Sequence, residues 1–271
     1  MMLLLDAGNT RVKIAWLAAG AAARTTARTL DYARLDALAG LPPAPPSRIL
    51  ASNVAGPEAA QRIQQACRDA WGLTVRWCTP LDGRDRLQSA YTDPGRMGAD
   101  RWLGLLGLLT HLRAIPAWRR GHPALLASFG TATTLDALVP AAGHELPGFI
   151  GGLILPGPSL MAQSLARGTA QLPLAEGQWT DFPCTTQDAI ASGIAAAQAG
   201  ALLHQWQRLR RRAGGRTPWV FACGGGWPAL RPAVQSGLDQ ARHALRLPAQ
   251  AIQTLDSPVL DGLASLAAQP N

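Results

Sequence analysis

The chain has 271 residues, of which 48% are hydrophobic and only 15% are charged, a composition typical of a globular protein rather than a disordered or fibrous one. This length suits two domains of about 100 to 150 residues, and we expect them at residues 1–115 and 116–271. The net charge of +8 comes almost entirely from arginine. The densest arginine group, at residues 208–216, is typical of a solvated helix end, and nucleic-acid contact is the minority interpretation.

The longest apolar stretches fall short of the ~20 residues that a membrane-spanning helix needs. The N-terminus also lacks the pattern of a leader peptide. We therefore expect a cytoplasmic protein without a membrane or nucleic-acid partner. The four cysteines are scattered without a CxxC pair, which argues against a zinc site and a disulfide framework and predicts reduced, mostly buried thiols.

In the first half, apolar runs at residues 2–7 and 12–17 flank the turn Gly8-Asn9-Thr10 and predict a β-hairpin. Prolines between residues 42 and 46 predict a stiff connector. The other expected elements are strands at residues 25–30, 48–54 and 75–78, a helix at 57–71, and a helix at 98–114 that is apolar on nearly every side and therefore buried.

The second half begins again with a strand at residues 124–127, a glycine turn at Gly130 and a β-rich run at 131–139. Residues 3–10 align with residues 125–132, and chance or domain duplication explains this weak repeat. In a duplicated chain a ligand is expected between the two glycine turns. The remaining expected elements are a long helix at 186–212, a strand at 219–223 and a tight turn at Gly224–Gly226 that leads into a helix.

The segment from Asp6 to Thr10 brings a carboxylate, a glycine and small polar side chains to the end of a strand. That combination suits ATP with its magnesium ion, although the same residues also favour an ordinary hairpin turn. Lys13 lies just beyond the turn and is placed to pair with phosphate, or is an ordinary surface lysine.

Three later glycine segments allow similar alternatives. Gly130 to Thr134 offers hydroxyls for phosphate, with Asp136 as the nearest carboxylate, or is simply a threonine-rich strand. Gly224–Gly226 permits close approach of a ring or ribose, or is a helix-entry turn. The glycines between Gly148 and Pro158 indicate close approach of a ligand or another backbone, or a glycine-rich hairpin without function.

Asp100, in Gly98-Ala99-Asp100-Arg101, opens the apolar helix, where a carboxylate ordinarily stabilises the helix dipole. Its functional interpretation is a general base, with Arg101 binding an anionic group of the acceptor. Tyr91, one of only two tyrosines, either forms a wall of the acceptor pocket or merely packs.

Together these motifs, in this order and at these separations, resemble the type III pantothenate kinase family, which includes the Bvg accessory factors. The resemblance implies an α/β acetate and sugar kinase/Hsp70/actin-like fold, with two RNase H-like domains and mixed central sheets. It implies a homodimer and a reaction in which ATP phosphorylates pantothenate, the first step of coenzyme A biosynthesis.

The resemblance also implies residue roles. Asp100 is the catalytic base, Asp6 positions Mg²⁺ directly or through water, and Thr186 reaches the acceptor pocket of the neighbouring subunit. The implied ATP-binding residues are Asp6, Ala7, Gly8, Asn9, Thr10, Arg11, Val12, Lys13 and Thr131, and the implied pantothenate-binding residues are Tyr91, Gly98, Ala99, Asp100, Arg101 and Thr186.

Ser128 departs from the family pattern, because it stands where the family usually has an aspartate that binds a monovalent cation. Serine carries no charge to hold K⁺ or NH₄⁺ tightly, which puts dependence on such a cation and full catalytic competence in doubt. The alternative function is a catalytically weak, kinase-fold regulatory or transcription accessory factor. A kinase of the same fold with another acceptor is the third hypothesis.

Overall fold

The structure, a computed structural model, describes residues 1–21, 23–141, 145–169, 172 and 177–267. The chain forms two compact units. Unit 1 comprises residues 1–120, 140–150 and 256–271, and unit 2 comprises residues 121–139 and 151–255. The first change of unit comes at residue 120, close to the predicted boundary, while the domain assignment 1–115 and 116–271 stays a prediction.

Unit 1 contains a five-stranded mixed sheet. The strand β1 pairs antiparallel with β2 and parallel with β4, so the predicted hairpin forms and a third strand extends it on the other side. The strands follow one another across the sheet in the order β3 (Arg28–Leu30), β2 (Val12–Leu17), β1 (Met2–Ala7), β4 (Arg48–Asn53) and β5 (Val75–Trp77).

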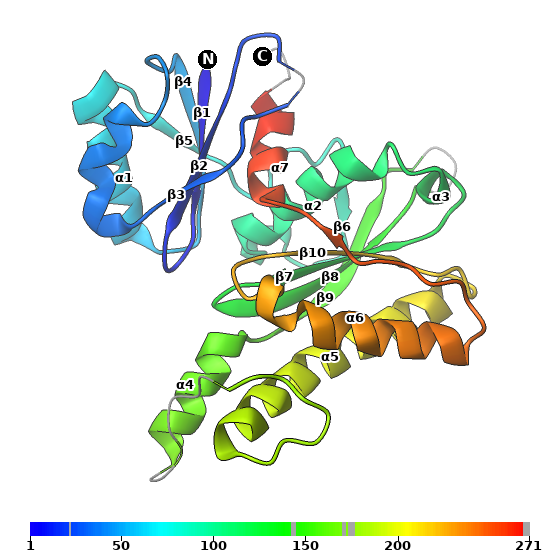
Figure 1. Ribbon diagram of the computed structural model, residues 1–271. Coiled ribbons are helices and arrows are strands. Elements are labelled where there is room, and N and C mark those ends of the chain that lie inside the picture. The colour runs from blue at the N-terminus through cyan, green and yellow to red at the C-terminus, as the bar shows by residue number, and fades with distance from the viewer. Residues whose placement is uncertain (22, 142–144, 170–171, 173–176, 268–271) are drawn as a thin grey trace. The chain divides into compact units, whose positions relative to one another are not determined.

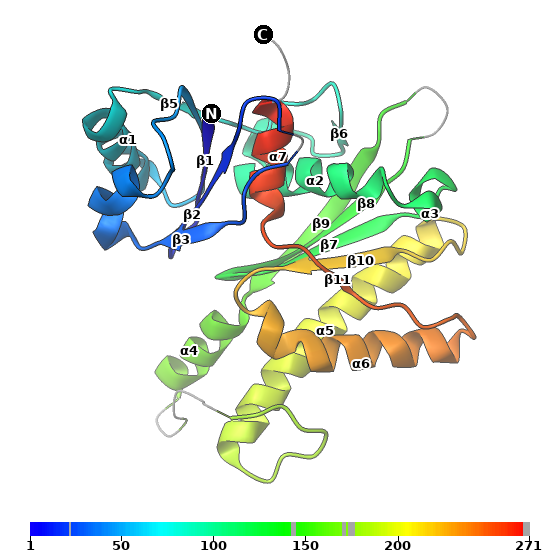
Figure 2. The same ribbon diagram turned by 45° about the horizontal axis from the view of Figure 1, so that its top comes forward.

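Helices cover both faces of this sheet, and Figures 1 and 2 show α1 (Pro57–Trp71) and α7 (Pro258–Ala267) on opposite sides of it. Alternate residues of β1 point to opposite faces. Leu3, Leu5 and Ala7 therefore share a buried core with α1 and the 3₁₀ helix η1 (Tyr32–Gly40). Leu4 and Asp6 lie on the other face, where α7 contacts β1 and α2 (Ala99–Leu112) contacts β4.

The helices α2 and α7 pack against each other at two glycines. A Cβ on Gly107 would collide with the Pro258 carbonyl, and a Cβ on Gly262 would collide with the Leu103 carbonyl. Ten residues of α2 are buried, as its apolar sequence predicts. The C-terminal helix α7 thus holds the helix whose first turn carries Asp100.

Unit 2 contains a second mixed sheet, in which β7 pairs antiparallel with β8 and parallel with β10. Figures 1 and 2 show α5 (Thr186–Arg212) and α6 (Trp227–Ala244) packed together along this sheet. The strand order is β11 (Gln253–Thr254), β10 (Trp219–Cys223), β7 (Ala124–Phe129), β8 (Ala132–Val139), β9 (Gly148–Pro156) and β6 (Gln88–Ser89).

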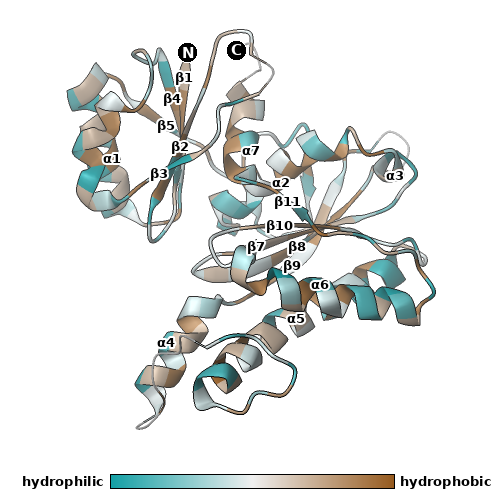
Figure 3. Ribbon diagram, viewed as in Figure 1, coloured by the Kyte–Doolittle hydropathy of each residue, from teal (hydrophilic) through white to brown (hydrophobic). Residues whose placement is uncertain are grey.

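The two sheets share one topology. In each, a hairpin is extended by parallel strands next to its first strand, so β1, β2, β4 and β5 correspond to β7, β8, β10 and β11. Figure 3 shows hydrophobic colours dominating the central strands, while α1, α5 and α6 alternate between hydrophobic and polar residues. The predicted fold class, with two mixed sheets in a duplicated α/β chain, is confirmed.

Shorter elements complete the chain. The strand β9 begins in unit 1, where Gly148 and Phe149 pair with β6. The shorter elements, in chain order, are β6 (Gln88–Ser89), η2 (Pro94–Arg96), α3 (Pro116–Arg119) and α4 (Pro158–Gly168). No helix of the described residues has the length and hydrophobicity to cross a membrane.

Candidate functional site

Asp6, in unit 1, is the penultimate residue of β1, directly before the four-residue turn that leads into β2. The Gly8 amide donates a hydrogen bond of 3.1 Å to the Arg11 carbonyl and closes this turn. Asp6 lies opposite Lys13 on β2 and opposite Ser52 on β4, so the three side chains emerge on the same face of the sheet. One carboxylate, one cation and one hydroxyl therefore gather beside an exposed glycine turn.

Burial raises the pKa of Asp6 from 3.8 to about 7, the Lys13 cation opposes this rise, and the nearby Asp100 carboxylate adds to it. Lys13 is the only lysine of the chain. Its position across the hairpin from Asp6 places a cation beside the turn, and its pairing with phosphate stays a prediction.

Ser52 is a polar residue of this site that the sequence patterns did not single out. Its side chain is 0% exposed, and no hydrogen-bond partner for its hydroxyl oxygen exists among the described residues. An unpaired buried hydroxyl costs roughly 1 to 3 kcal/mol, so such groups are few in natural proteins. No sequence signal identifies it, because its significance comes only from the pairing of β4 with β1.

Asp100 lies in the first turn of α2, two residues after the N-cap Gly98. Its carboxylate accepts a 2.8 Å hydrogen bond from the Arg101 amide, and a Cβ at Gly98 would lie 2.7 Å from the same oxygen. Burial raises the pKa of Asp100, while the Arg101 amide and guanidinium oppose the rise. Gly98 thus leaves room for a partly desolvated carboxylate.

Arg101 turns back toward Tyr91 and is 7% exposed. Its guanidinium donates a 2.7 Å hydrogen bond to the Tyr91 hydroxyl and lies 5.7 Å from the ring centroids of both Tyr91 and Phe149. The two rings are themselves 5.5 Å apart. Such contacts with aromatic faces hold a guanidinium in a fixed position. Phe149 belongs to the glycine-rich segment, and its place beside Arg101 could not be read from the sequence.

Tyr32 is a third residue that the sequence patterns missed. It opens η1, and its hydroxyl donates a 2.7 Å hydrogen bond to the carbonyl of Gly8 in the turn after Asp6. Nothing in the spacing of this tyrosine predicts the contact.

The corresponding turn of unit 2 follows β7. Ser128 takes the place of Asp6 as the penultimate strand residue, and its neighbours across the sheet are Thr134 and Cys223. The Gly130 amide donates to the Ala132 carbonyl at 3.1 Å. The predicted ATP-contacting Thr131 lies exposed at this turn. Position 128 and its strand partners therefore carry neither the carboxylate nor the cation found at Asp6 and Lys13, and the nearest carboxylate on β8 is the buried Asp136, opposite Leu126.

Two glycines of unit 2 are required by close approach of backbone to backbone. A Cβ on Gly157 would collide with the Gly130 carbonyl, and a Cβ on Gly224, whose φ is +98°, would collide with the Phe129 carbonyl. For Gly157 this favours close backbone approach over a glycine-rich hairpin without function. Gly224–Gly226 forms the entry turn of α6, with the Gly226 amide donating to the Phe129 carbonyl at 2.9 Å.

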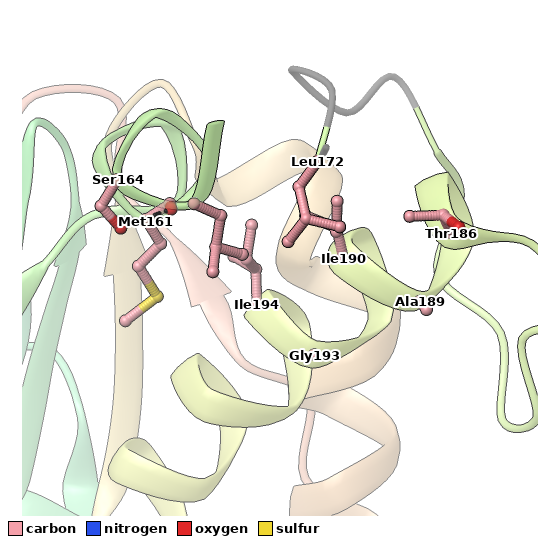
Figure 4. A pocket seen from close by; sticks show the side chains of 9 residues that line it. Met161, Ser164, Leu172, Thr186, Ala189, Ile190, Gly193 and Ile194 are labelled. Atoms are coloured by element: carbon pink, nitrogen blue, oxygen red, sulfur yellow. Dashed lines mark hydrogen bonds between the residues drawn. The ribbon is translucent and has the colours of Figure 1, made fainter. Parts of the chain in front are cut away.

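Thr186 is the first residue of α5 and lines an apolar cavity of ≈ 560 Å³ between α4 and α5 (Figure 4). Apolar side chains supply most of its wall, and the hydroxyls of Thr186 and Ser164 are its polar groups. Leu160, an apolar residue of α4 that does not line this cavity, is 41% exposed.

Asp6 and the hydroxyl of Ser52 are suited to a hydrated magnesium ion. Among the described residues no three His, Cys, Asp or Glu side chains form a metal-binding cluster. Mg²⁺ usually retains several waters and takes only one or two protein carboxylates besides substrate phosphates, which matches a single strand-end aspartate. The three buried cysteines, Cys67, Cys78 and Cys223, and the exposed Cys184 are free thiols, as predicted.

Comparisons with known proteins identify one family and support the fold. A family model described as type III pantothenate kinase matches residues 2–208. The chain is 45% identical to a type III pantothenate kinase of Bordetella petrii, over 100% of this chain and 98% of the relative, and 44% identical to that of Bordetella pertussis, over 99% and 98%. The solved structure of Lmo2764, a putative N-acetylmannosamine kinase from Listeria monocytogenes, is similar with a TM-score of 0.51, 13% identity and 98% coverage of both chains, which supports the fold.

Proposed function

The chain belongs to the type III pantothenate kinase family, and we propose that it transfers the γ-phosphoryl group of ATP to the terminal hydroxyl of pantothenate, forming 4′-phosphopantothenate. This would be the first step of coenzyme A biosynthesis. The observation that carries the proposal is that, within unit 1, the buried Asp100 carboxylate lies near Asp6, at the start of the glycine turn.

Asp100 would act as the general base. Its raised pKa makes the carboxylate a better proton acceptor than an exposed aspartate, while the Arg101 amide holds one oxygen in place. As the pantothenate oxygen forms its bond to phosphorus and the bond to ADP breaks, the hydroxyl proton would pass to Asp100. Alignment and charge neutralisation would supply most of the rate, as in other phosphoryl transfers.

Arg101 and Tyr91 would bind pantothenate. Pantothenate carries a carboxylate, and a guanidinium fixed by two aromatic rings is suited to bind it. Gly98 and Ala99 would allow the acceptor to approach the start of α2, since neither has a side chain beyond Cβ.

The residues from Asp6 to Lys13, together with Thr131, would bind the phosphates of ATP. Backbone amides of the glycine turn favour anions, and Lys13 adds a positive charge beside Asp6. Asp6 would hold Mg²⁺ directly or through water, and the ion would supply neutralisation of phosphate charge. Ser128 brings no carboxylate to the corresponding turn, so we propose that K⁺ or NH₄⁺ is not held there by a charged side chain.

We also propose a homodimer with shared acceptor sites. The support is the apolar cavity at Thr186 and the exposed apolar residue Leu160 of α4, together with the arrangement that the family resemblance implies. Co-expression of Asp100→Asn with Thr186→Val tests it. If Thr186 serves the partner's site, each mixed dimer contains one intact site. Because about half of the randomly assembled dimers are mixed, about a quarter of all sites should be active. Recovery of none would contradict shared sites.

The regulatory alternative has less support. Arg210, Arg211 and Arg212 lie in the last turn of α5, where cations stabilise the helix dipole, so this cluster needs no nucleic-acid partner. We also propose that the protein is located in the cytoplasm, where ATP is available.

The direct test is incubation of purified protein with pantothenate, ATP and Mg²⁺, in K⁺ and in Na⁺ buffer, with phosphopantothenate detected by mass spectrometry. Product in the wild type and its loss in Asp100→Asn are expected. Absence of product in both buffers would overturn the proposal, and phosphorylation of a different acceptor would support the third hypothesis instead.

A further inference from the structure

Tyr32 joins two elements of unit 1 to the turn after Asp6. Its hydroxyl donates a 2.7 Å hydrogen bond to the Gly8 carbonyl, which is 24 residues away in sequence. Its own carbonyl accepts a 2.6 Å hydrogen bond from the Arg62 guanidinium on α1. Its partly buried ring packs against the core shared by β1, α1 and η1. The hydroxyl is therefore held at the turn from the side of α1 and η1.

The acceptor of this bond determines which part of the turn is held. The Gly8 carbonyl belongs to the same planar trans peptide as the Asn9 amide, and the two groups point in opposite directions. A hydrogen bond that fixes the carbonyl therefore also fixes the direction of the Asn9 N–H. Asn9 itself is exposed at the tip of the turn.

Glycine makes such a restraint useful. Gly8 has no Cβ and a wide range of backbone conformations, so the peptide between Gly8 and Asn9 rotates more easily than an ordinary one. The bond from the Gly8 amide to the Arg11 carbonyl restrains the preceding peptide. The bond from Tyr32 restrains the following one.

We propose that Tyr32 is a positioning residue for nucleotide binding: its hydroxyl holds the Gly8–Asn9 peptide so that the Asn9 amide is presented to a phosphate oxygen. This inference rests on the proposed role of residues 6–13 in binding ATP. Tyr32 itself does not need to touch the nucleotide.

The hydroxyl must remain protonated, because a carbonyl can only accept a hydrogen bond. Burial and the Asp6 charge raise the pKa of Tyr32, with Arg62 opposing them. The phenol therefore remains a donor at physiological pH.

Tyr32→Phe removes the hydroxyl alone, and Tyr91→Phe, at the only other tyrosine, is the matched control. Calorimetry of Mg·ADP binding without pantothenate, and KM for both substrates, are the measurements. For Tyr32→Phe we expect the Kd of Mg·ADP to rise about 3- to 10-fold, as for loss of one hydrogen bond, with the KM of pantothenate changed less than about twofold. Tyr91→Phe is expected to show the opposite pattern.

The Asn9 amide resonance of ¹⁵N-labelled protein gives a second measurement. It is expected to shift in unliganded Tyr32→Phe, which a purely structural role elsewhere would not cause. Unchanged Mg·ADP affinity, or equal weakening of both substrates, would overturn the inference. If Tyr32→Phe folds poorly, Arg62→Ala removes the anchor of Tyr32 and is expected to weaken Mg·ADP in the same direction; unchanged affinity in that variant overturns the inference too.

Failure of the proposed function can be distinguished from failure of the inference about Tyr32. Wild-type protein that binds Mg·ADP but phosphorylates no pantothenate contradicts the proposed reaction and leaves the Tyr32 comparison valid. Wild-type protein that does not bind Mg·ADP contradicts both.

Discussion

The carboxylate of Asp100, at the start of α2, lies close enough to Asp6, at the end of β1, for its charge to raise the pKa of Asp6. Burial is the larger cause of that rise, and Lys13 on the neighbouring strand opposes it. At neutral pH the Asp6 carboxyl of the unliganded protein is thus only about half ionised, between the Lys13 cation and the nearby Asp100. A cation bound at Asp6 would relieve this repulsion.

The first prediction concerns stability and pH. The pKa of Asp6 is about 7 in the folded chain and near its ordinary value of 3.8 in the unfolded chain, so the folded state binds the proton more tightly. The contribution of Asp6 therefore lowers the free energy of unfolding as pH rises from about 4 to about 7. Denaturant unfolding of unliganded Asp6→Asn should lack this loss and show greater stability than wild type at pH 8. Equal stability of both proteins at pH 8 would contradict the claim that ionisation of Asp6 destabilises the folded state.

The second prediction separates chemistry from binding. Asp100→Asn removes the proposed base, and we expect turnover to fall by at least about 100-fold, the lower end of general-base contributions. It also removes a negative charge near Asp6, which lowers the pKa of Asp6 and should leave Mg·ADP affinity equal to or tighter than wild type at pH 6. Single-turnover kinetics and calorimetry measure the two effects. Near-normal turnover would exclude Asp100 as the base.

Local patterns predicted the elements whose side chains alternate or repeat clearly. The two hairpins, the strand at Arg48–Asn53, α1 and α2 follow from apolar periodicity and glycine turns. The strand expected at residues 25–30 is shorter, because Thr25 bonds to Trp16 through both its amide and its hydroxyl before the regular ladder begins at Arg28.

Other elements depend on their partners and had no comparable signal. The two-residue strands β6 and β11 exist only through pairing with β9 and β10. The helices α4 and α7 were not predicted, and α7 derives its position from the glycine contacts with α2.

The residues of the candidate site also divide into those that local patterns identified and those that only tertiary contacts bring together. Asp6, Lys13 and Asp100 were identifiable because each belongs to a continuous motif. Tyr32, Ser52 and Phe149 reach the site from separate segments, through a tertiary hydrogen bond, a strand register and a ring contact. No local pattern encodes those contacts.

The third prediction concerns Ser52, whose buried hydroxyl has no partner among the described side chains and backbone groups. Ser52→Ala removes an unsatisfied polar group, so the unliganded protein should gain about 1 kcal/mol of unfolding free energy. If the hydroxyl serves a ligand or its water at Asp6, the same variant should bind Mg·ADP more weakly. Loss of stability in the absence of ligand would show that the hydroxyl already has a partner.

The fourth prediction compares two glycines of unit 2. Gly157→Ala places a methyl group against the Gly130 carbonyl and should destabilise the protein by about 1 to 3 kcal/mol. Gly200→Ala, in an exposed part of α5 with no atom near the added Cβ, should stabilise it by about 0.5 to 1 kcal/mol through helix propensity. Chemical denaturation measures both. Similar effects of the two variants would contradict the close approach at Gly157.

The last prediction concerns Ser128, which takes in unit 2 the place that Asp6 takes in unit 1. A neutral hydroxyl there holds a monovalent cation weakly, so the wild-type rate should differ little between K⁺ and Na⁺ at equal ionic strength. Ser128→Asp supplies a carboxylate beside Thr134, without a lysine opposite to neutralise it, and should make the rate depend on K⁺. Ser128→Asn, which has a similar shape and no charge, is the control and should remain insensitive. A strong K⁺ requirement in the wild type would mean that backbone carbonyls and water supply the ligands, and the side chain at position 128 would then not decide cation dependence.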